Sequence, residues 1–361
     1  MNSTLTTYGL HDRFKQEATL YEGLFLARVL EQHRDLYKVV CERGQLHAGI
    51  SGKLSYQAAD SLSYPAVGDW VMIDRTDGHS GKAIIHHILR RKSVFARQAA
   101  GTGKEQQVIA ANIDTVFICM SLNADFNLRR MERYLTIAWD SNAKPVIVLT
   151  KSDLCEDLSE KLKELETVSL GVDTLVCSSM SKDGYEAVAR YIEAGKTIAL
   201  IGSSGVGKST LINRLLGQEL MATREIRADD DKGKHATTHR QLIVLPDGGI
   251  VIDTPGMREL GVFSGSLSTT FEDIAELSAG CKFGNCSHGT EPGCAVQGAI
   301  ANGLLSAQRF ESYKKLQREM SYEGLNARQL EDEKIRAFGW SKNEIKQFKR
   351  QVKSKQHKGS Q

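Results

Sequence analysis

The sequence predicts an α/β protein, in which a small five-stranded β-barrel precedes a parallel sheet with helices on both faces and a helical metal-binding unit follows it. Three observations support this fold class. A glycine-rich loop of the form G-x-x-x-x-G-K-[ST] occupies residues 202–209, between an apolar run and a helix-competent run. Five short β-rich runs fill residues 23–97. Three cysteines and one histidine lie within residues 281–294.

The composition describes an ordinary multidomain protein. At 361 residues the chain exceeds the usual size of one hydrophobic core, so we expect two or three domains. It has no run of eighteen apolar residues, and its first residues lack the basic-then-apolar order of a secretory signal. We therefore expect a cytoplasmic protein without a membrane segment, in which clustered cysteines bind metal rather than form disulfides.

Residues 1–22 are polar and predict a partly ordered arm, and residues 23–98 predict a barrel of the OB type. An SH3-like barrel or a sandwich would leave a similar pattern. The expected strands cover residues 24–30, 36–41, 45–50, 67–73 and 83–89. Arg90, Arg91, Lys92 and Arg97 close this segment with positive charge, which suits either an RNA-contacting edge or a solvated strand end.

Residues 99–262 alternate between strand and helix patterns, which predicts a parallel sheet. The expected strands cover residues 114–121, 145–149, 174–177 and 198–201, and the expected helices 127–140, 156–168, 184–194 and 209–216. A hairpin is expected from residues 241–245 and 249–252.

The glycine-rich loop predicts a nucleoside triphosphate site. Gly202, Gly205 and Gly207 let the backbone turn its N–H groups toward phosphate oxygens, and the following helix adds the positive end of its dipole. Lys208 can reach the β- and γ-phosphates, and Ser209 can offer its hydroxyl to Mg²⁺. The other loop residues expected to contact the nucleotide are Ser203, Ser204, Val206 and Thr210.

A second motif predicts that the base is guanine. Asp153, in the run from Thr150 through Lys151, can accept two hydrogen bonds from guanine, while the Lys151 stem covers the base. Adenine cannot offer that pair of donors, and two bonds to a carboxylate contribute roughly 1.5–3 kcal/mol each. Ser178 and Ser179, after the next expected strand, can supply backbone contacts to the base oxygen.

The order of the motifs predicts a circular permutation. In most GTPases the phosphate loop precedes the base motif, but here the base motif comes about fifty residues earlier. A parallel sheet tolerates this when its old termini are joined, because domain termini lie close together. Asp253 and Gly256 complete the expected set: the carboxylate orients Mg²⁺ through water, and the Gly256 N–H senses the γ-phosphate.

Residues 20–320 resemble the circularly permuted RsgA (YjeQ) GTPases of small-ribosomal-subunit biogenesis. The resemblance rests on the motifs above and on residues 107–114, 233–238 and 281–296. The resemblance implies an OB barrel, a permuted GTPase domain and a C-terminal zinc domain. It also implies a GTP phosphohydrolase that releases GDP and phosphate, is stimulated by the small (30S) subunit and acts late in its maturation. The implied partners are that subunit and its 16S rRNA.

The sequence departs from the family pattern at two positions. Thr150 stands where the family has Asn, which leaves its tether to the phosphate loop open. Ala236 stands where a third Thr is common, so the threonine that binds Mg²⁺ and the γ-phosphate is Thr237 or Thr238.

Met257 follows Gly256 where many GTPases have a water-orienting glutamine, so we expect slow turnover by the isolated protein. His235 can orient the water instead, or it can be a surface histidine of a basic loop. The expected catalytic set is therefore His235, Lys208 and Thr238.

Cys281, Cys286, His288 and Cys294 supply three thiolates and one imidazole, the ligand set of a closed structural Zn²⁺ site. The alternative is a set of unpaired structural cysteines. We assign this cluster to a helical zinc domain at residues 263–333. The scattered cysteines are expected in the core, and they are Cys41, Cys119, Cys155 and Cys177.

Helices are expected at residues 269–278 and 295–320, and the tail at residues 334–361 has nine basic residues against one acid. Such a tail suits either a nucleic-acid backbone or a solvated, disordered end. The basic residues of the second helix are Arg309, Lys314, Lys315 and Arg318. We expect a monomer that binds the small ribosomal subunit.

Two other functions fit parts of the pattern. One is an RNA-binding module whose nucleotide only orders its loops. The other is an ATP-dependent enzyme such as a kinase, against which Asp153 and residues 253–256 argue.

Overall fold

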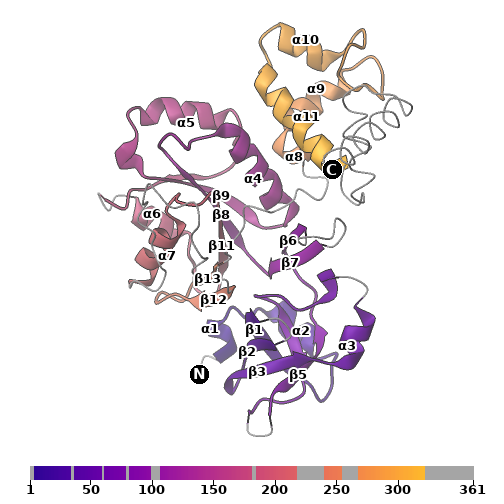
Figure 1. Ribbon diagram of the computed structural model, residues 1–361, viewed down its shortest axis with the longest axis vertical. Helices are drawn as coiled ribbons and strands as arrows, with labels where there is room; N and C mark the ends of the chain where they lie inside the picture. Colours follow the sequence, from indigo (N-terminus) through magenta and orange to yellow (C-terminus); the bar gives the residue numbers. More distant parts are fainter. Residues whose placement is uncertain are drawn as a thin grey trace, which may run out of the picture.

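The computed structural model describes residues 4–33, 36–58, 61–78, 81–98, 106–180, 184–217, 240–253 and 267–321. Figure 1 shows three units along the longest axis: a β-barrel, a sheet flanked by helices, and a helical unit. This is the expected architecture. None of the described helices is both long and apolar enough to cross a membrane.

Five strands close the N-terminal barrel, as predicted. They are β1 (Phe25–His33), β2 (Leu36–Cys41), β3 (Gly44–Ile50), β4 (Trp70–Ile73) and β5 (Ala83–Ile88). Neighbouring strands are antiparallel except β3 and β5, and pairing of β1 with β4 completes the ring. Inward-facing side chains such as Val29, Val39 and Val71 are fully buried. α3 (Gly52–Gln57) and η1 (Ser61–Ser63) connect β3 to β4.

Two short helices precede the barrel, where the sequence predicted only a partly ordered arm. α1 (Thr4–Thr7) and α2 (Asp12–Ala18) bury Leu5 and Phe14. The ring of Phe14 lies 5.6 Å from the ring of Trp70 in β4. The segment therefore packs on the barrel through a few widely spaced apolar residues, which form no periodic pattern in the sequence.

The central sheet has the strand order β10-β9-β8-β11-β13-β12. All neighbours are parallel except β12, which forms the predicted hairpin with β13. The strands are β8 (Thr115–Ser121), β9 (Lys144–Thr150), β10 (Thr174–Val176), β11 (Thr197–Ile201), β12 (Gln241–Val244) and β13 (Ile250–Asp253).

Helices cover both faces of this sheet because strand side chains alternate between two apolar clusters. In β8, Ile118 belongs to the cluster that contains Leu135 of α4. Its neighbour Phe117 belongs to the cluster that contains Val188 of α6 and Leu211 of α7. The helices are α4 (Leu128–Asp140), α5 (Leu158–Glu166), α6 (Tyr185–Arg190) and α7 (Lys208–Leu216), with η2 (Ser152–Leu154) after β9.

The barrel and the central sheet are continuous, which the sequence did not reveal. β1 pairs with β12 at Glu31 and Gln241, so that eleven strands form one sheet. A separate hairpin of β6 (Val94–Gln98) and β7 (Gln106–Ala111) lies in the connection between them. A register shift in this hairpin disturbs the period-two pattern from which a strand is normally recognised.

A partly buried group of charged residues holds the same junction. Arg28 of β1 is 1% exposed and donates hydrogen bonds to the Gly68 carbonyl (3.2 Å) and the Thr197 hydroxyl (2.9 Å). Asp114 accepts from the Thr197 N–H (2.8 Å) and from Lys92 (2.5 Å). The first residue of β11 is therefore fixed from both sides.

Arg91, at the end of the barrel segment, is paired inside the fold. Arg91 forms an ion pair with Asp69, which is completely buried, and also donates to the carbonyls of Leu62 and Tyr64. Neither alternative from the sequence, an RNA-contacting edge or a solvated strand end, therefore describes Arg91. A basic run in the sequence cannot show that its counter-ion lies 22 residues away.

The C-terminal unit contains four described helices where the sequence predicted two. They are α8 (Leu267–Thr270), α9 (Glu272–Ala279), α10 (Ala295–Ala301) and α11 (Ala307–Ser321). The expected helix over residues 295–320 was wrong, because the chain turns at Gly303, whose φ is +72°, and buries Leu305.

Arg309 joins this unit to the central sheet rather than facing solvent. It contacts Glu132 of α4 (2.9 Å) and Asp273 of α9 (2.6 Å), and its side chain is 12% exposed. Glu132 is itself 2% exposed, so removal of either partner would leave a buried charge. The suggestion that Arg309 contacts RNA is therefore not supported.

Asp114→Asn tests the junction through its pH dependence. Burial opposes ionisation of Asp114, but Lys92 and the Thr197 N–H outweigh it and hold the pKa of the carboxyl below its ordinary value. A carboxylate with a depressed pKa stabilises the fold above the unfolded-state pKa, and this contribution is lost as the pH falls through the folded-state pKa. We expect Asp114→Asn to cost about 3 kcal/mol at neutral pH, with the difference shrinking below about pH 4.

Urea unfolding at several pH values measures this difference. Asp12→Asn is the control, because that carboxylate has the same charge but is 85% exposed. A constant difference between Asp114→Asn and wild type from pH 7 to pH 3 would contradict the ionic role.

Candidate nucleotide and metal sites

The glycine-rich loop connects the end of β11 to the start of α7. Gly202 has a φ of +147°, and a Cβ there would lie only 2.3 Å from the Cys119 carbonyl oxygen. Only glycine fits this close approach to β8. The ammonium of Lys208 donates to the carbonyls of Gly202 (2.8 Å) and Ser203 (2.6 Å), so the loop curves around its own lysine.

Thr150 connects the base motif to the phosphate loop. It ends β9, is 6% exposed, and its hydroxyl donates to the Val206 carbonyl at 2.5 Å, with the Met120 carbonyl oxygen 3.4 Å away. The tether that the Asn-to-Thr departure left open is therefore present. Two segments 56 residues apart in the chain meet at this bond.

The base motif also meets the loop after β10. The Ser178 hydroxyl, which is fully buried, donates to one carboxylate oxygen of Asp153, and Ser152 N–H donates to the Cys177 carbonyl (3.3 Å). Ser179 follows in the same loop. Because β9 and β10 are parallel neighbours, the loops at their carboxyl ends lie at one edge of the sheet.

The other predicted nucleotide contacts divide into described and undescribed residues. Ser209 and Thr210 lie in the first turn of α7, and Asp253 ends β13 beside β11. Outside the described residues lie His235, Thr237, Thr238 and Gly256.

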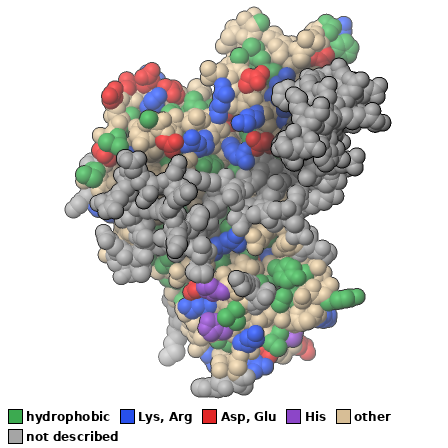
Figure 2. All heavy atoms as spheres, in the orientation of Figure 1, with side chains coloured by type: hydrophobic (Ala, Val, Ile, Leu, Met, Phe, Trp, Pro, Cys, Tyr) green, Lys and Arg blue, Asp and Glu red, His purple; other side chains and the backbone are tan. Residues whose placement is uncertain are grey.

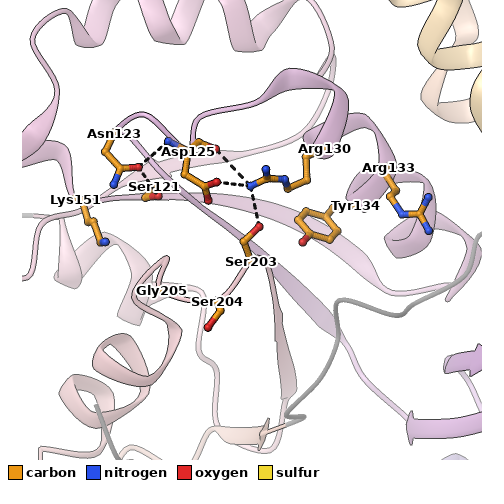
Figure 3. A pocket seen from close by; sticks show the side chains of 10 residues that line it. All are labelled: Ser121, Asn123, Asp125, Arg130, Arg133, Tyr134, Lys151, Ser203, Ser204 and Gly205. Atoms are coloured by element: carbon orange, nitrogen blue, oxygen red, sulfur yellow. Dashed lines mark hydrogen bonds and ion pairs between the residues drawn. The ribbon is translucent and has the colours of Figure 1, made fainter. Parts of the chain in front are cut away.

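A pocket of about 510 Å³ lies between the phosphate loop and α4 (Figure 3). From the predicted set it contains Lys151, Ser203, Ser204 and Gly205. Its other lining residues, which the sequence analysis missed, are Ser121, Asn123, Asp125, Arg130, Arg133 and Tyr134. Polar residues directly after a buried strand were the available signal, because ligands bind at the carboxyl ends of parallel strands.

The four predicted metal ligands converge in the C-terminal unit. The ligand atoms of Cys281, Cys286, His288 and Cys294 all lie within 4.8 Å of one another. His288 Nδ1 lies 3.6 Å from the sulfur of Cys281 and 3.5 Å from that of Cys294. Such a set of thiols and one imidazole fits a four-coordinate soft or borderline cation.

Neighbouring side chains orient the histidine of this cluster. Nε2 of His288 lies 3.1 Å from the Ser278 hydroxyl of α9, which leaves Nδ1 to face the sulfurs. Gln297 of α10 donates to the His288 carbonyl at 2.7 Å. Partners of this kind fix the ring orientation of a metal-binding histidine.

The cysteines expected in the core are mostly there. Cys41, Cys119 and Cys177 are buried, whereas Cys155 is partly exposed. Burial raises the pKa of the Cys119 thiol to about 12, so this thiol is not a nucleophile near neutral pH.

Comparisons with known proteins agree with this geometry. A family model described as RsgA GTPase matches residues 88–263. Small ribosomal subunit biogenesis GTPase RsgA 2 of Lactiplantibacillus plantarum is 53% identical over 359 residues, 99% of this chain and 100% of the relative. The protein of the same description from Listeria monocytogenes is 48% identical over 321 residues, 88% of this chain and 90% of the relative.

Two crystal structures are also similar. YjeQ from Thermotoga maritima is 26% identical with a TM-score of 0.59, and the match covers 82% of this chain and 98% of that one. YloQ, described as a circularly permuted GTPase, is 25% identical with a TM-score of 0.59, covering 83% and 96%. With the base motif ahead of a phosphate loop that it contacts, and relatives this similar along the whole chain, this protein is a member of the RsgA GTPase family.

Proposed function

We propose that this protein hydrolyses GTP to GDP and phosphate and acts as a late maturation factor of the small (30S) ribosomal subunit, which stimulates the reaction. The observation that carries the proposal is the contact of Thr150 with Val206, because it brings a guanine-reading motif to a phosphate-binding loop. The names of the relatives, small ribosomal subunit biogenesis GTPases, support the partner and the process.

The phosphates are bound by backbone N–H groups of residues 202–210 and by Lys208, at the positive end of the α7 dipole. Ser209 and either Thr237 or Thr238 hold Mg²⁺, and Asp253 orients it through water. Mg²⁺ neutralises charge that develops on the β- and γ-phosphates during transfer.

Asp153 reads the base. Its carboxylate accepts from the ring N–H and the exocyclic amine of guanine, and the Ser178 hydroxyl fixes its orientation. Lys151 covers the base, and the loop of Ser178 and Ser179 contacts the base oxygen.

His235 orients the attacking water, since the residue directly after Gly256 is Met257 and not glutamine, and methionine cannot hydrogen-bond a water usefully. Gly256, with either Thr237 or Thr238, detects the γ-phosphate. The small subunit is proposed to complete this arrangement, so turnover by the isolated chain is expected to be slow.

Basic surface is proposed to contact 16S rRNA. Figure 2 shows Lys and Arg side chains over the region of α4 and α11. On α11 the candidates are Lys314, Lys315 and Arg318, and the tail at residues 334–361 adds nine basic residues. We propose that the protein acts in the cytoplasm as a monomer.

The Cys281, Cys286, His288 and Cys294 cluster is proposed to bind one structural Zn²⁺. Four protein ligands leave no open position, so this ion would stabilise the C-terminal unit rather than activate water.

Asp153→Asn tests base reading. The amide cannot accept from both guanine donors, so we expect GTP affinity to fall about 100-fold. Affinity for xanthosine triphosphate should rise, because its carbonyl can accept from the new amide. Equilibrium titration measures both. Glu156→Gln is the matched control, an exposed acid three residues further along. Equal GTP affinity in Asp153→Asn and wild type would reject this role.

GTP turnover with and without purified small subunits tests the activity. We expect small subunits to increase GTP turnover by wild type. His235→Ala should still bind GTP, but its turnover in the presence of small subunits should be at least 100-fold slower than that of wild type. Lys234→Ala is the control within the same segment.

Nucleotide binding without stimulated turnover in wild type would favour an RNA-binding module, and displacement of GTP by ADP would favour an ATP-dependent enzyme.

Removal of the metal tests the cluster. Wild type should contain about one zinc per chain, and chelation should lower its thermal midpoint, because zinc binding supplies folding free energy in small metal domains. Cys294→Ala should lose the zinc, whereas Cys155→Ala, the control outside the cluster, should keep it. Metal content that Cys294→Ala leaves unchanged would reject the site.

A further inference from the structure

Arg130 bridges α4 and the phosphate loop. Its Nη1 lies 2.8 Å from the hydroxyl of Ser203 and 2.7 Å from a carboxylate oxygen of Asp125. Figure 3 shows the guanidinium pointing from α4 toward Ser203, with Ser204 and Gly205 beyond it along the loop. The side chain is 33% exposed, so it lies at the pocket wall and not in the core.

The backbone on both sides of this contact is fixed. Asn127 caps α4 by accepting from the Arg130 N–H at 3.0 Å. Asn123 accepts from the Asp125 N–H at 3.0 Å and from the Ser121 hydroxyl at 2.9 Å. The guanidinium and its carboxylate partner therefore start from defined positions, and only the side chains must move to exchange partners.

The pocket has the charge that a polyphosphate needs. Among the described lining residues, three are cations (Arg130, Arg133 and Lys151) and one is an anion (Asp125), a net charge of +2. Glu319 of α11 offsets the charge of Arg133 through an ion pair, and Arg130 is the lining arginine that contacts the loop.

We propose that Arg130 binds the phosphate chain of the nucleotide, exchanging the carboxylate of Asp125 for phosphate oxygens. The inference rests on the proposed function, because it assigns a further ligand to the same nucleotide. A guanidinium forms paired, charge-assisted hydrogen bonds with phosphate, for which its planar donors are well suited. Asp125 holds the guanidinium beside the loop until phosphate replaces it.

Nucleotide affinity of the full chain tests the inference, with GTP and GDP titrated separately. We expect Arg130→Ala to weaken binding about 10- to 100-fold, and Arg130→Lys to weaken it less because a charge remains without the planar donors. Arg129→Ala, an exposed arginine next to it on α4, should match wild type. A larger loss for GTP would assign the contact to the terminal phosphate, and equal losses to the phosphates that both share.

Asp125→Asn tests whether Arg130 binds phosphate or only positions the phosphate loop through its ion pair with Asp125. If Asp125 competes with phosphate, the variant should bind nucleotide at least as tightly as wild type. A loss as large as that of Arg130→Ala would instead show that the ion pair only positions the loop, and would overturn the inference. So would wild-type affinity in Arg130→Ala.

A failure of the proposed function can be distinguished from a failure of the Arg130 inference. Wild-type protein that binds no guanine nucleotide would reject both the proposed function and the inference. Guanine binding that depends on Asp153 but not on Arg130 would reject only this inference.

Discussion

The hydrogen bond from Thr150 to the Val206 carbonyl is the contact on which the nucleotide site depends. It joins two loops that the chain reaches in the reverse of the usual order. Because β9 and β11 run parallel on either side of β8, their carboxyl ends lie at one edge whichever is made first. The permutation thus changes the connections of the sheet and leaves the position of its ligand loops intact.

The same helix that carries Arg130 also holds the C-terminal unit. Glu132, two residues further along α4, forms the buried ion pair with Arg309, and Arg133 forms the ion pair with Glu319. α4 therefore lines the pocket, and its residues Glu132 and Arg133 form ion pairs with α11. In this arrangement α4 lies between the nucleotide pocket, which it lines, and α11 of the unit that contains the metal cluster.

The sequence was sufficient wherever local patterns decide the structure. The barrel strands and the parallel sheet were predicted because apolar alternation and turn residues mark their ends. Contacts across the fold were not predictable: the buried counter-ion of Arg91, the role of Arg309 and the packing of Phe14. The turn at Gly303 is local, but it was missed because apolar residues continue on both sides of it. The phosphate loop and metal ligands were found by their spacing, whereas Asp125 and Arg130 belong to no motif and become a site only when α4 lies beside residues 203–205.

The pairing of β1 with β12 bears on how the protein unfolds. A barrel whose β1 pairs with β12 of the neighbouring sheet, and whose Arg28 is buried at the junction, is not an autonomous module. Separating the barrel from the central sheet would expose a strand edge. It would also break the hydrogen bond that the Arg28 guanidinium donates to the Thr197 hydroxyl. The barrel and the central sheet should therefore unfold in one cooperative transition, although the sequence patterns divide them into two domains.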